Sequence, residues 1–236
     1  GSGERFKNEN YITPKILLPV NKKPLIVNII KSFKNQLTTK ILLKSNNDSV
    51  IEELNNNFNN LDIVTIEEKT ENQSESALKL INQIENNNPI LVHSADCILD
   101  KDVNLDLVNF DVAILTKQNY RRAFHSYKNY GWVNASEGVI DSFSIKKRPS
   151  NEKSTVMTGI FIFKDKEIFK YLYNETKENI ENKIEMHIDY LIETAFNKKM
   201  NVLEVKTDKT AMIGTPLEYE LFNYMFKVNS YLSLKK

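Results

Sequence analysis

The sequence predicts an α/β protein in which a mainly parallel sheet carries helices on both faces. Short apolar runs alternate with segments of helical periodicity from residue 24 to residue 96, the order typical of parallel strands joined by helices. Three strand-like segments then follow one another without a helix between them, which predicts a small antiparallel lobe. With 236 residues, 41% of them hydrophobic, the chain can form one sizeable core, so we expect a single domain over residues 1–236.

The first half of the chain supplies the alternating elements. Leu25, Ile29 and Phe33 have helical spacing and Pro24 suits a first turn, which predicts a helix over 24–33. The elements expected next are a strand over 40–43, a helix capped by Asp48, a strand over 62–66, a helix opened by Ser74 or Ser76, and a strand over 89–93.

The second half begins with an apolar strand over 111–115 and continues with the antiparallel lobe over 130–134, 139–145 and 156–163. Apolar residues at helical spacing predict helices over 165–174 and 178–197, and a last strand is expected over 201–205. A terminal helix starts at Pro216, and its apolar face is expected to be core or a dimer contact.

Composition excludes several classes of protein. Lysine and arginine total 32 against 31 acidic residues, so the net charge of +1 creates no overall field for nucleic acid or anionic membrane. The single cysteine, Cys97, cannot form an intrachain disulfide, and the sequence shows no signal peptide and no apolar run of about 20 residues. We therefore expect a cytoplasmic protein that recognises phosphate locally.

The N-terminal segment has the features of a grip for a nucleoside triphosphate. Glycines let the backbone approach a phosphate, and Arg5 and Lys15 supply positive charge. A dinucleotide-binding loop would need glycine where Phe6 stands, and the Gly-Lys-Ser/Thr of a Walker A loop is absent. The predicted nucleotide contacts of this segment are Gly1, Ser2, Gly3, Glu4, Arg5 and Lys15.

Gly-x-Gly-x-Arg-Phe followed by Tyr11, Pro14-Lys15 and Lys23-Pro24-Leu25 resembles the signature of nucleotidyltransferases that make activated sugars and related compounds. The likeness is strongest to their short bacterial branch, of cytidylyltransferase type, in capsule and surface-polysaccharide synthesis. Later segments keep the family's order: Gln73-Ser74-Glu75-Ser76 resembles the base-recognition segment, Ala95-Asp96 the metal aspartate, Thr158-Gly159-Ile160-Phe161 the acceptor strand and Gly214-Thr215-Pro216 the closing turn.

The resemblance implies a three-layer αβα, Rossmann-like (GT-A-like) fold with a mixed, mainly parallel sheet and a small antiparallel lobe on the acceptor side. Relatives carry a hydrophobic strand directly before the glycine loop, and residue 1 is already inside that loop, so we expect the first strand to be missing. The implied reaction is attack of an acceptor phosphate oxygen on the α-phosphorus of a nucleoside triphosphate, with release of pyrophosphate and a requirement for Mg²⁺. Arg5, Lys15 and Asp96 are the implied catalytic residues, although Asp96 can also be read as a turn cap.

Two departures from the family pattern are serious, and a third is Asn72, which replaces the usual glycine before Gln73. Met212 stands where many relatives carry a second metal aspartate, and Asp189, Asp208 and Glu185 are candidate substitutes, with Glu185 and Asp189 four residues apart on one expected helical face. We take Asp189 as the second metal ligand beside Asp96. The usual Glu-Lys pair is replaced by Lys146-Lys147-Arg148-Pro149. The predicted acceptor contacts are Lys147, Arg148, Gly159, Glu185 and Asp189.

CTP is the first expectation for the donor, and the acceptor is a sugar 1-phosphate or a non-sugar phosphate such as phosphocholine or phosphoglutamine. A homodimer is the expected assembly if the terminal helix supplies a dimer contact. One rival is a glycosyltransferase of the same architecture that binds metal through Asp100-Lys101-Asp102. The other is a regulatory module that binds nucleotide without catalysis.

Overall fold

The computed structural model describes the backbone of residues 3–33, 39–44, 47–59, 61–99, 107–136, 139–149, 151–180 and 185–233. The predicted contacts of Gly1 and Ser2 and the rival metal site at Asp100 to Asp102 lie outside these residues. The chain divides into two compact units, each described by itself. The first unit comprises Gly1–Glu68, Ala95–Val103 and Thr210–Lys236, and the second comprises Lys69–Ser94 and Asn104–Lys209.

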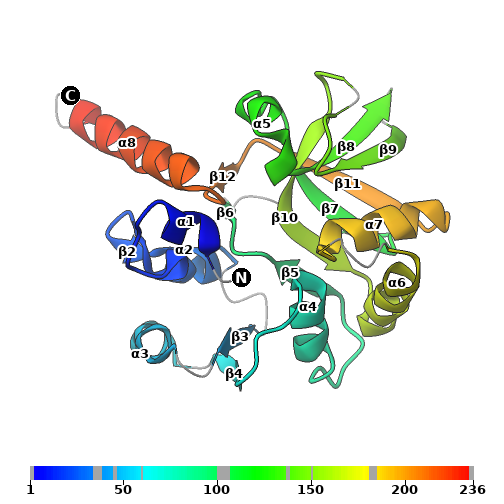
Figure 1. The fold of residues 1–236 in the computed structure, drawn as a ribbon, viewed down its shortest axis with the longest axis horizontal. Coiled ribbons are helices and arrows are strands. Elements are labelled where there is room, and N and C mark those ends of the chain that lie inside the picture. Colours follow the sequence, from blue (N-terminus) through cyan, green and yellow to red (C-terminus); the bar gives the residue numbers. More distant parts are fainter. Residues whose placement is uncertain are drawn as a thin grey trace. The chain divides into compact units, whose positions relative to one another are not determined.

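The first unit is built from short strands and helices drawn from three stretches of the sequence (Figure 1). Its strands form the antiparallel pairs β1–β2 and β6–β12 and the parallel pair β3–β4. Its elements are α1 (Glu4–Asn8), the 3-10 helix η1 (Lys15–Leu17), β1 (Pro19–Val20), β2 (Lys23–Pro24), α2 (Leu25–Ser32), β3 (Lys40–Lys44), α3 (Asp48–Asn57), β4 (Asp62–Ile66), β6 (Cys97–Leu99), β12 (Thr210–Met212) and α8 (Pro216–Ser233).

Two apolar clusters stabilise the first unit. One joins the N-terminal segment to the C-terminal one: the rings of Phe6, Tyr11 and Tyr219 pack edge to face, with centroids 5.3 to 6.2 Å apart. The other lies between α2, β3 and α3, where Val27 and Leu54 are fully buried. Burial of aromatic and aliphatic side chains therefore anchors α1 and α8 as well as the predicted helix over 24–33.

The second unit is a six-stranded sheet with helices beside it (Figure 1). The strand order is β11-β7-β10-β8-β9, and β5 also pairs with β10. Its elements are α4 (Gln73–Ile81), β5 (Ile90–His93), β7 (Val112–Lys117), α5 (Arg122–His125), the 3-10 helix η2 (Tyr127–Asn129), β8 (Gly131–Ser136), β9 (Val139–Ile145), β10 (Thr155–Phe163), α6 (Lys166–Asn179), α7 (Ile188–Asn197) and β11 (Val202–Thr207).

Strand β10 is the centre of this sheet. It runs antiparallel to β5, β7 and β8, whereas β7 and β11 are parallel. The predicted α/β class and antiparallel lobe are confirmed. The six-stranded sheet is mixed: within the described ranges its β7–β11 pairing is parallel and its other pairings are antiparallel, while the first unit holds the parallel pair β3–β4. The long apolar run of β10 lies between oppositely directed neighbours, a property that hydrophobicity alone does not encode.

The predicted single helix over 178–197 is wrong. Helix α6 continues to Asn179, and α7 begins only at Ile188, with His187 extended as its N-cap. The backbone before α7 bonds elsewhere: Ser74 donates its N–H to the carbonyl of Met186 (3.3 Å), and Ile188 donates its N–H to Gln73 Oε1 (3.3 Å). Glu185 therefore precedes the helix, and the expectation that it shares a helical face with Asp189 is also wrong.

The N-cap of α4 differs from both predicted candidates. Asn72 is the cap, and its side chain accepts the N–H of Glu75 at 2.9 Å. Ser74 lies inside the helix and is fully buried. Asparagine caps as well as serine does, and the choice between them depends on where the first turn packs.

No helix in the described part of the chain is both long enough and apolar enough to cross a membrane.

We predict that the free energy of unfolding falls less steeply at alkaline pH in Tyr11→Phe than in wild type. Tyr11 donates its hydroxyl to Glu220 Oε1 at 2.9 Å, and burial, followed by this hydrogen bond, raises its pKa to about 12. The unfolded phenol ionises near its ordinary pKa of about 10, so wild-type stability is lost as pH rises from about 10 to about 12. Urea unfolding at several alkaline pH values measures this slope.

Tyr171→Phe is the matched control because that tyrosine of α6 is 44% exposed, and it should leave the slope unchanged. An identical slope in Tyr11→Phe and wild type would contradict the prediction.

Candidate active site

Lys15 and Asp96, far apart in the sequence, meet in the first unit. Lys15 Nζ contacts Asp96 Oδ1 as an ion pair, and the side chains are 11% and 41% exposed, respectively. Gly3 lies beside Lys15: it has a positive φ of 65°, and a Cβ built there would be 3.6 Å from Lys15 Cβ. Gly3 and Lys15, two of the predicted triphosphate contacts, therefore belong to one cluster with the predicted metal aspartate.

Asp96 is held by the short pairing of β6 with β12. Ile213 donates its N–H to the carbonyl of Asp96 at 2.7 Å, directly after β12. This brings Gly214 against Asp96, because a Cβ at Gly214 would be 3.4 Å from Asp96 Cβ and 3.4 Å from Glu218 Oε2. We call Gly3, Lys15, Asp96, Gly214 and Glu218 the Asp96 cluster.

Glu218 was missed from the sequence although a signal for it exists. Thr215 and Glu218 form a reciprocal capping box at the start of α8: Glu218 Oε2 accepts the N–H of Thr215 at 2.9 Å, and Thr215 Oγ1 accepts the N–H of Glu218 at 3.2 Å. Thr-x-x-Glu with proline at the first helical position predicts this cap. The box buries a carboxylate, 3% exposed, beside Gly214.

The residues present fit Mg²⁺ as a partner of a bound nucleotide. Within the described ranges, no three His, Cys, Asp or Glu side chains gather into a group that could hold a metal ion. Met212 lies in β12 opposite Cys97 and is 7% exposed. Mg²⁺ is commonly held by one or two carboxylates together with substrate phosphates, and Asp96 can supply one such oxygen. Asp189 belongs to the second unit, so its role as the second ligand stays a prediction.

Arg5 lies in α1, which the burial of Phe6 holds in place. Glu4 and Arg5 are exposed on this helix, while Lys15 Nζ lies 5.8 Å from the centre of the Phe6 ring. A contact of Arg5 with phosphate therefore needs no rearrangement of the apolar cluster, and it stays a prediction.

A second cluster surrounds Gly131 at the start of β8. A Cβ at this position would lie 2.4 Å from Asp189 Oδ2 and 2.9 Å from Met157 Sδ, so any residue larger than glycine would require these side chains to shift. Asp189 is in the first turn of α7, and Glu193 follows one turn later. Lys147 lies near enough to Glu193 to affect its titration. We call Gly131, Lys147, Met157, Asp189 and Glu193 the Gly131 cluster.

Acidic groups dominate the electrostatics of this cluster. Burial raises the pKa of the half-buried Glu193, and the charge of Lys147 opposes that rise. Burial also raises the pKa of Tyr190, with Glu193 and Asp189 adding to the effect. Lys147 and Arg148 are exposed and follow Lys146, which has a positive φ of 56°. The cluster thus offers carboxylates together with solvent-accessible cations.

The other predicted site residues lie in the second unit. Gln73 Oε1 accepts a backbone N–H of α7, and Ser74 is fully buried with no hydrogen-bond partner for Oγ among the described residues. Gly159 has a positive φ of 82° at a register shift in β10, and its carbonyl accepts the N–H of Ser94 at 2.9 Å. Base reading and acceptor binding by these residues stay predictions.

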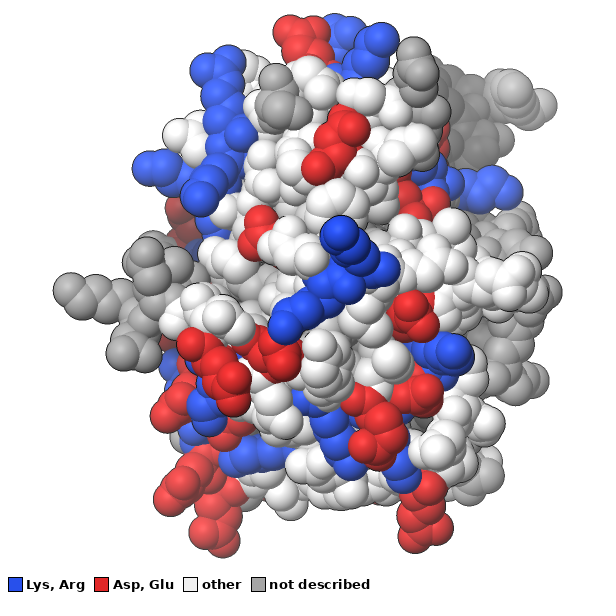
Figure 2. All heavy atoms as spheres, turned by 90° about the vertical axis from the view of Figure 1, so that its right-hand side faces the viewer, with Lys and Arg blue, Asp and Glu red and all other residues white. Residues whose placement is uncertain are grey.

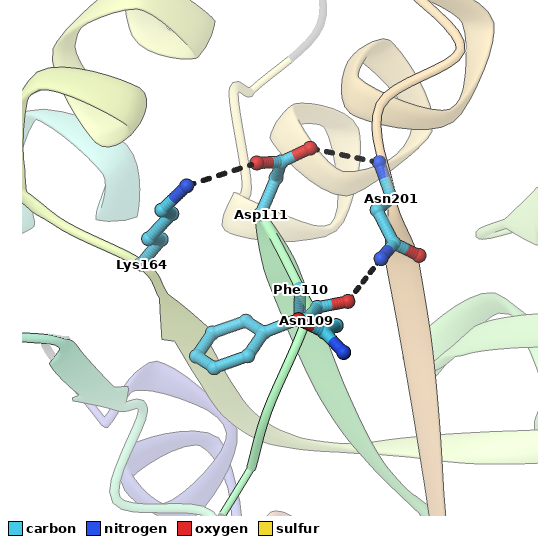
Figure 3. Close-up of a pocket in the computed structure, with 5 residues that line it drawn as sticks. All are labelled: Asn109, Phe110, Asp111, Lys164 and Asn201. Carbon is cyan, nitrogen blue, oxygen red and sulfur yellow. Dashed lines mark hydrogen bonds and ion pairs between the residues drawn. The ribbon is translucent and has the colours of Figure 1, made fainter.

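A pocket of about 430 Å³ in the second unit is a poor candidate (Figure 3). Asp111 there accepts the N–H of Asn201 at 2.9 Å and faces Lys164 Nζ at 3.9 Å. These contacts tie together the start of β7, the end of β10 and the start of β11. The pocket is at the amino end of the parallel pair β7–β11, whereas ligands of α/β sheets lie at carboxyl ends.

The face of the molecule in Figure 2 shows basic and acidic side chains interspersed, without a large region of one sign. This face therefore offers no large basic region to attract phosphate, in line with the net charge of +1.

The sequence and the fold were compared with those of known proteins. The family model described as nucleotidyl transferase matches residues 1–219. A nucleoside-diphosphate-sugar pyrophosphorylase from Vibrio cholerae has 17% identity and a TM-score of 0.78, covering 95% of this chain and 97% of that one. The inositol-1-phosphate CTP transferase of T. maritima has 15% identity, a TM-score of 0.70 and coverages of 97% and 92%.

The CTP:phosphocholine cytidylyltransferase of Streptococcus pneumoniae has 14% identity, a TM-score of 0.68 and coverages of 96% and 95%. No match was found among curated proteins.

We predict that Gly131→Ala destabilises the protein by about 1–3 kcal/mol, because the new Cβ overlaps Asp189 and Met157. Urea unfolding measures this loss. Asp189→Ala added to Gly131→Ala should recover part of it, so the two changes should be coupled. Additive effects in the double variant would contradict the proposed contact.

Proposed function

Because the chain belongs to the nucleotidyl transferase family, we propose that it transfers a nucleoside monophosphate, in the first instance CMP from CTP, to a phosphorylated small molecule and releases pyrophosphate. The observation that carries the proposal is the contact of Lys15 with Asp96 beside Gly3. This cluster joins a cation for phosphate oxygens to a carboxylate suited to Mg²⁺.

The chemistry is an in-line displacement. An oxygen of the acceptor phosphate attacks the α-phosphorus, the bond from that phosphorus to the bridging oxygen of the β-phosphate breaks, and pyrophosphate leaves with the electron pair. Lys15 and Arg5 neutralise charge on the phosphoryl oxygens, and the Gly3 backbone permits close approach. Asp96 would hold Mg²⁺, which supplies further charge neutralisation when bound.

The Gly131 cluster is the proposed acceptor site. Lys147 and Arg148 are exposed cations for the acceptor phosphate, and Asp189 is a carboxylate that can accept hydrogen bonds from hydroxyl groups or an amine and can attract a quaternary ammonium by charge. Such groups suit a sugar 1-phosphate, phosphocholine or phosphoglutamine. Two proteins of similar fold are named for inositol 1-phosphate and phosphocholine, which supports a phosphorylated small molecule.

We also propose that the product serves capsule or surface-polysaccharide synthesis and that the reaction takes place in the cytoplasm. We further propose a homodimer through α8, where Leu217, Tyr224 and Met225 are exposed. A glycosyltransferase would use a nucleotide sugar without releasing pyrophosphate, and a regulatory module would bind the triphosphate without turnover.

We predict pyrophosphate release that depends on one triphosphate and one acceptor. The assay combines ATP, CTP, GTP, UTP and dTTP, each with Mg²⁺, with sugar 1-phosphates, phosphocholine and phosphorylated amino acids. Asp96→Asn and Lys15→Gln should each lower kcat/KM about a hundredfold or more, because the first weakens the hold on Mg²⁺ and the second removes a positive charge from the phosphates.

Asp62→Asn is the matched control, since Asp62 contacts Lys40 in another Lys–Asp pair of the first unit. Full activity of Asp96→Asn would remove Asp96 from the mechanism. Triphosphate binding without release from any acceptor would favour the regulatory module.

We predict that Lys147→Gln raises KM for the acceptor about tenfold while leaving triphosphate binding unchanged, because one cation for the acceptor phosphate is lost. Steady-state kinetics with either substrate varied measure the split. Lys153→Gln, an exposed lysine before β10, is the control. Equal effects of the two variants would argue against acceptor binding by Lys147.

A further inference from the structure

We propose that a divalent cation enters the Asp96 cluster only together with the triphosphate, because Lys15 occupies Asp96 until phosphate oxygens replace that carboxylate. This inference rests on the proposed function and adds an order of assembly to it. It concerns residues within the first unit alone.

The ion pair leaves little attraction for a bare cation. Lys15 Nζ contacts Asp96 Oδ1, so the two formal charges cancel locally. Met212 fills the position where a second carboxylate is expected, and the buried Glu218 uses Oε2 to cap α8. The part of the chain that the structure describes contains no group of three Asp, Glu, His or Cys side chains that could hold a metal ion in competition with the lysine.

Displacing Lys15 by a cation is unfavourable in the absence of phosphate. The lysine side chain is only 11% exposed, and among the described residues it forms no second ion pair. The Phe6 ring centre lies 5.8 Å from Lys15 Nζ, and an aromatic ring is a weak partner for an ammonium group. A cation on Asp96 would therefore leave a largely buried ammonium beside a like charge.

A triphosphate changes this balance. Its oxygens offer Lys15 a new anionic partner, and the lysine can then exchange carboxylate for phosphate without losing charge neutralisation. Asp96 is released to ligate the cation that the phosphates bring. Cation and triphosphate consequently raise each other's affinity by the same factor.

The test measures Mn²⁺ binding by electron paramagnetic resonance, which needs no turnover. Wild type should bind Mn²⁺ alone weakly. Lys15→Gln should bind it about tenfold more tightly, since Asp96 is then unmasked. Asp96→Asn, alone or combined with Lys15→Gln, should abolish this gain, and Lys15→Arg should stay weak because the pair persists. Circular dichroism verifies that each variant is folded.

Lys40→Gln is the matched control, because it removes the same charge from the Lys40–Asp62 pair and should leave Mn²⁺ binding unchanged. In a second arm, equilibrium dialysis compares the affinity of wild type for α,β-methylene CTP with Mn²⁺ and with EDTA. Mn²⁺ should raise that affinity in wild type about tenfold and raise it much less in Lys15→Gln.

Wild type that binds Mn²⁺ alone as tightly as Lys15→Gln, or Lys40→Gln that tightens binding equally, would overturn the inference even if the enzyme turns over normally. Failure of the proposed function looks different: no triphosphate yields pyrophosphate with any acceptor, whatever the order of the Mn²⁺ affinities.

Discussion

The three-residue ladder between β6 and β12 is the constraint on which the first unit depends. It places Ile213 where its N–H reaches the Asp96 carbonyl, and that bond fixes the approach of Gly214. The capping box of α8 starts one residue later, so the direction of the terminal helix follows from the same ladder. One short pairing thus sets the positions of a backbone turn, a helix and the carboxylate of Asp96.

Local patterns in the sequence predicted most of the regular elements. The spacing of Leu25 and Ile29 located α2, and the apolar runs located β3, β4 and β5, because each signal lies within a few residues. Strands β6 and β12 were missed because three residues carry no period. The break before α7 was missed because it depends on bonds to Gln73, 115 residues from Ile188. A signal of that kind is tertiary and has no trace in periodicity.

The candidate site was predicted unevenly for the same reason. The family resemblance predicted Gly3, Lys15 and Asp96 as site residues, and these three lie together in the structure. It did not identify Gly131, whose need for glycine comes from Asp189 on another element. The resemblance also did not identify Glu218, although Thr215 and Pro216 indicate the start of a helix. Close approaches between distant segments are set by packing, and a single sequence does not reveal them.

The discontinuous first unit has a consequence for synthesis on the ribosome. Among the residues that the structure describes, the ladder partner of strand β6 is β12, which is translated more than a hundred residues later. At about 5–20 residues per second, the nascent chain spends roughly 5 to 20 seconds with this edge unpaired. One part of the second unit, Lys69–Ser94, is translated before β6, and the other part, Asn104–Lys209, is translated between β6 and β12. The second unit can therefore emerge complete during that interval. The Asp96 cluster is therefore assembled last.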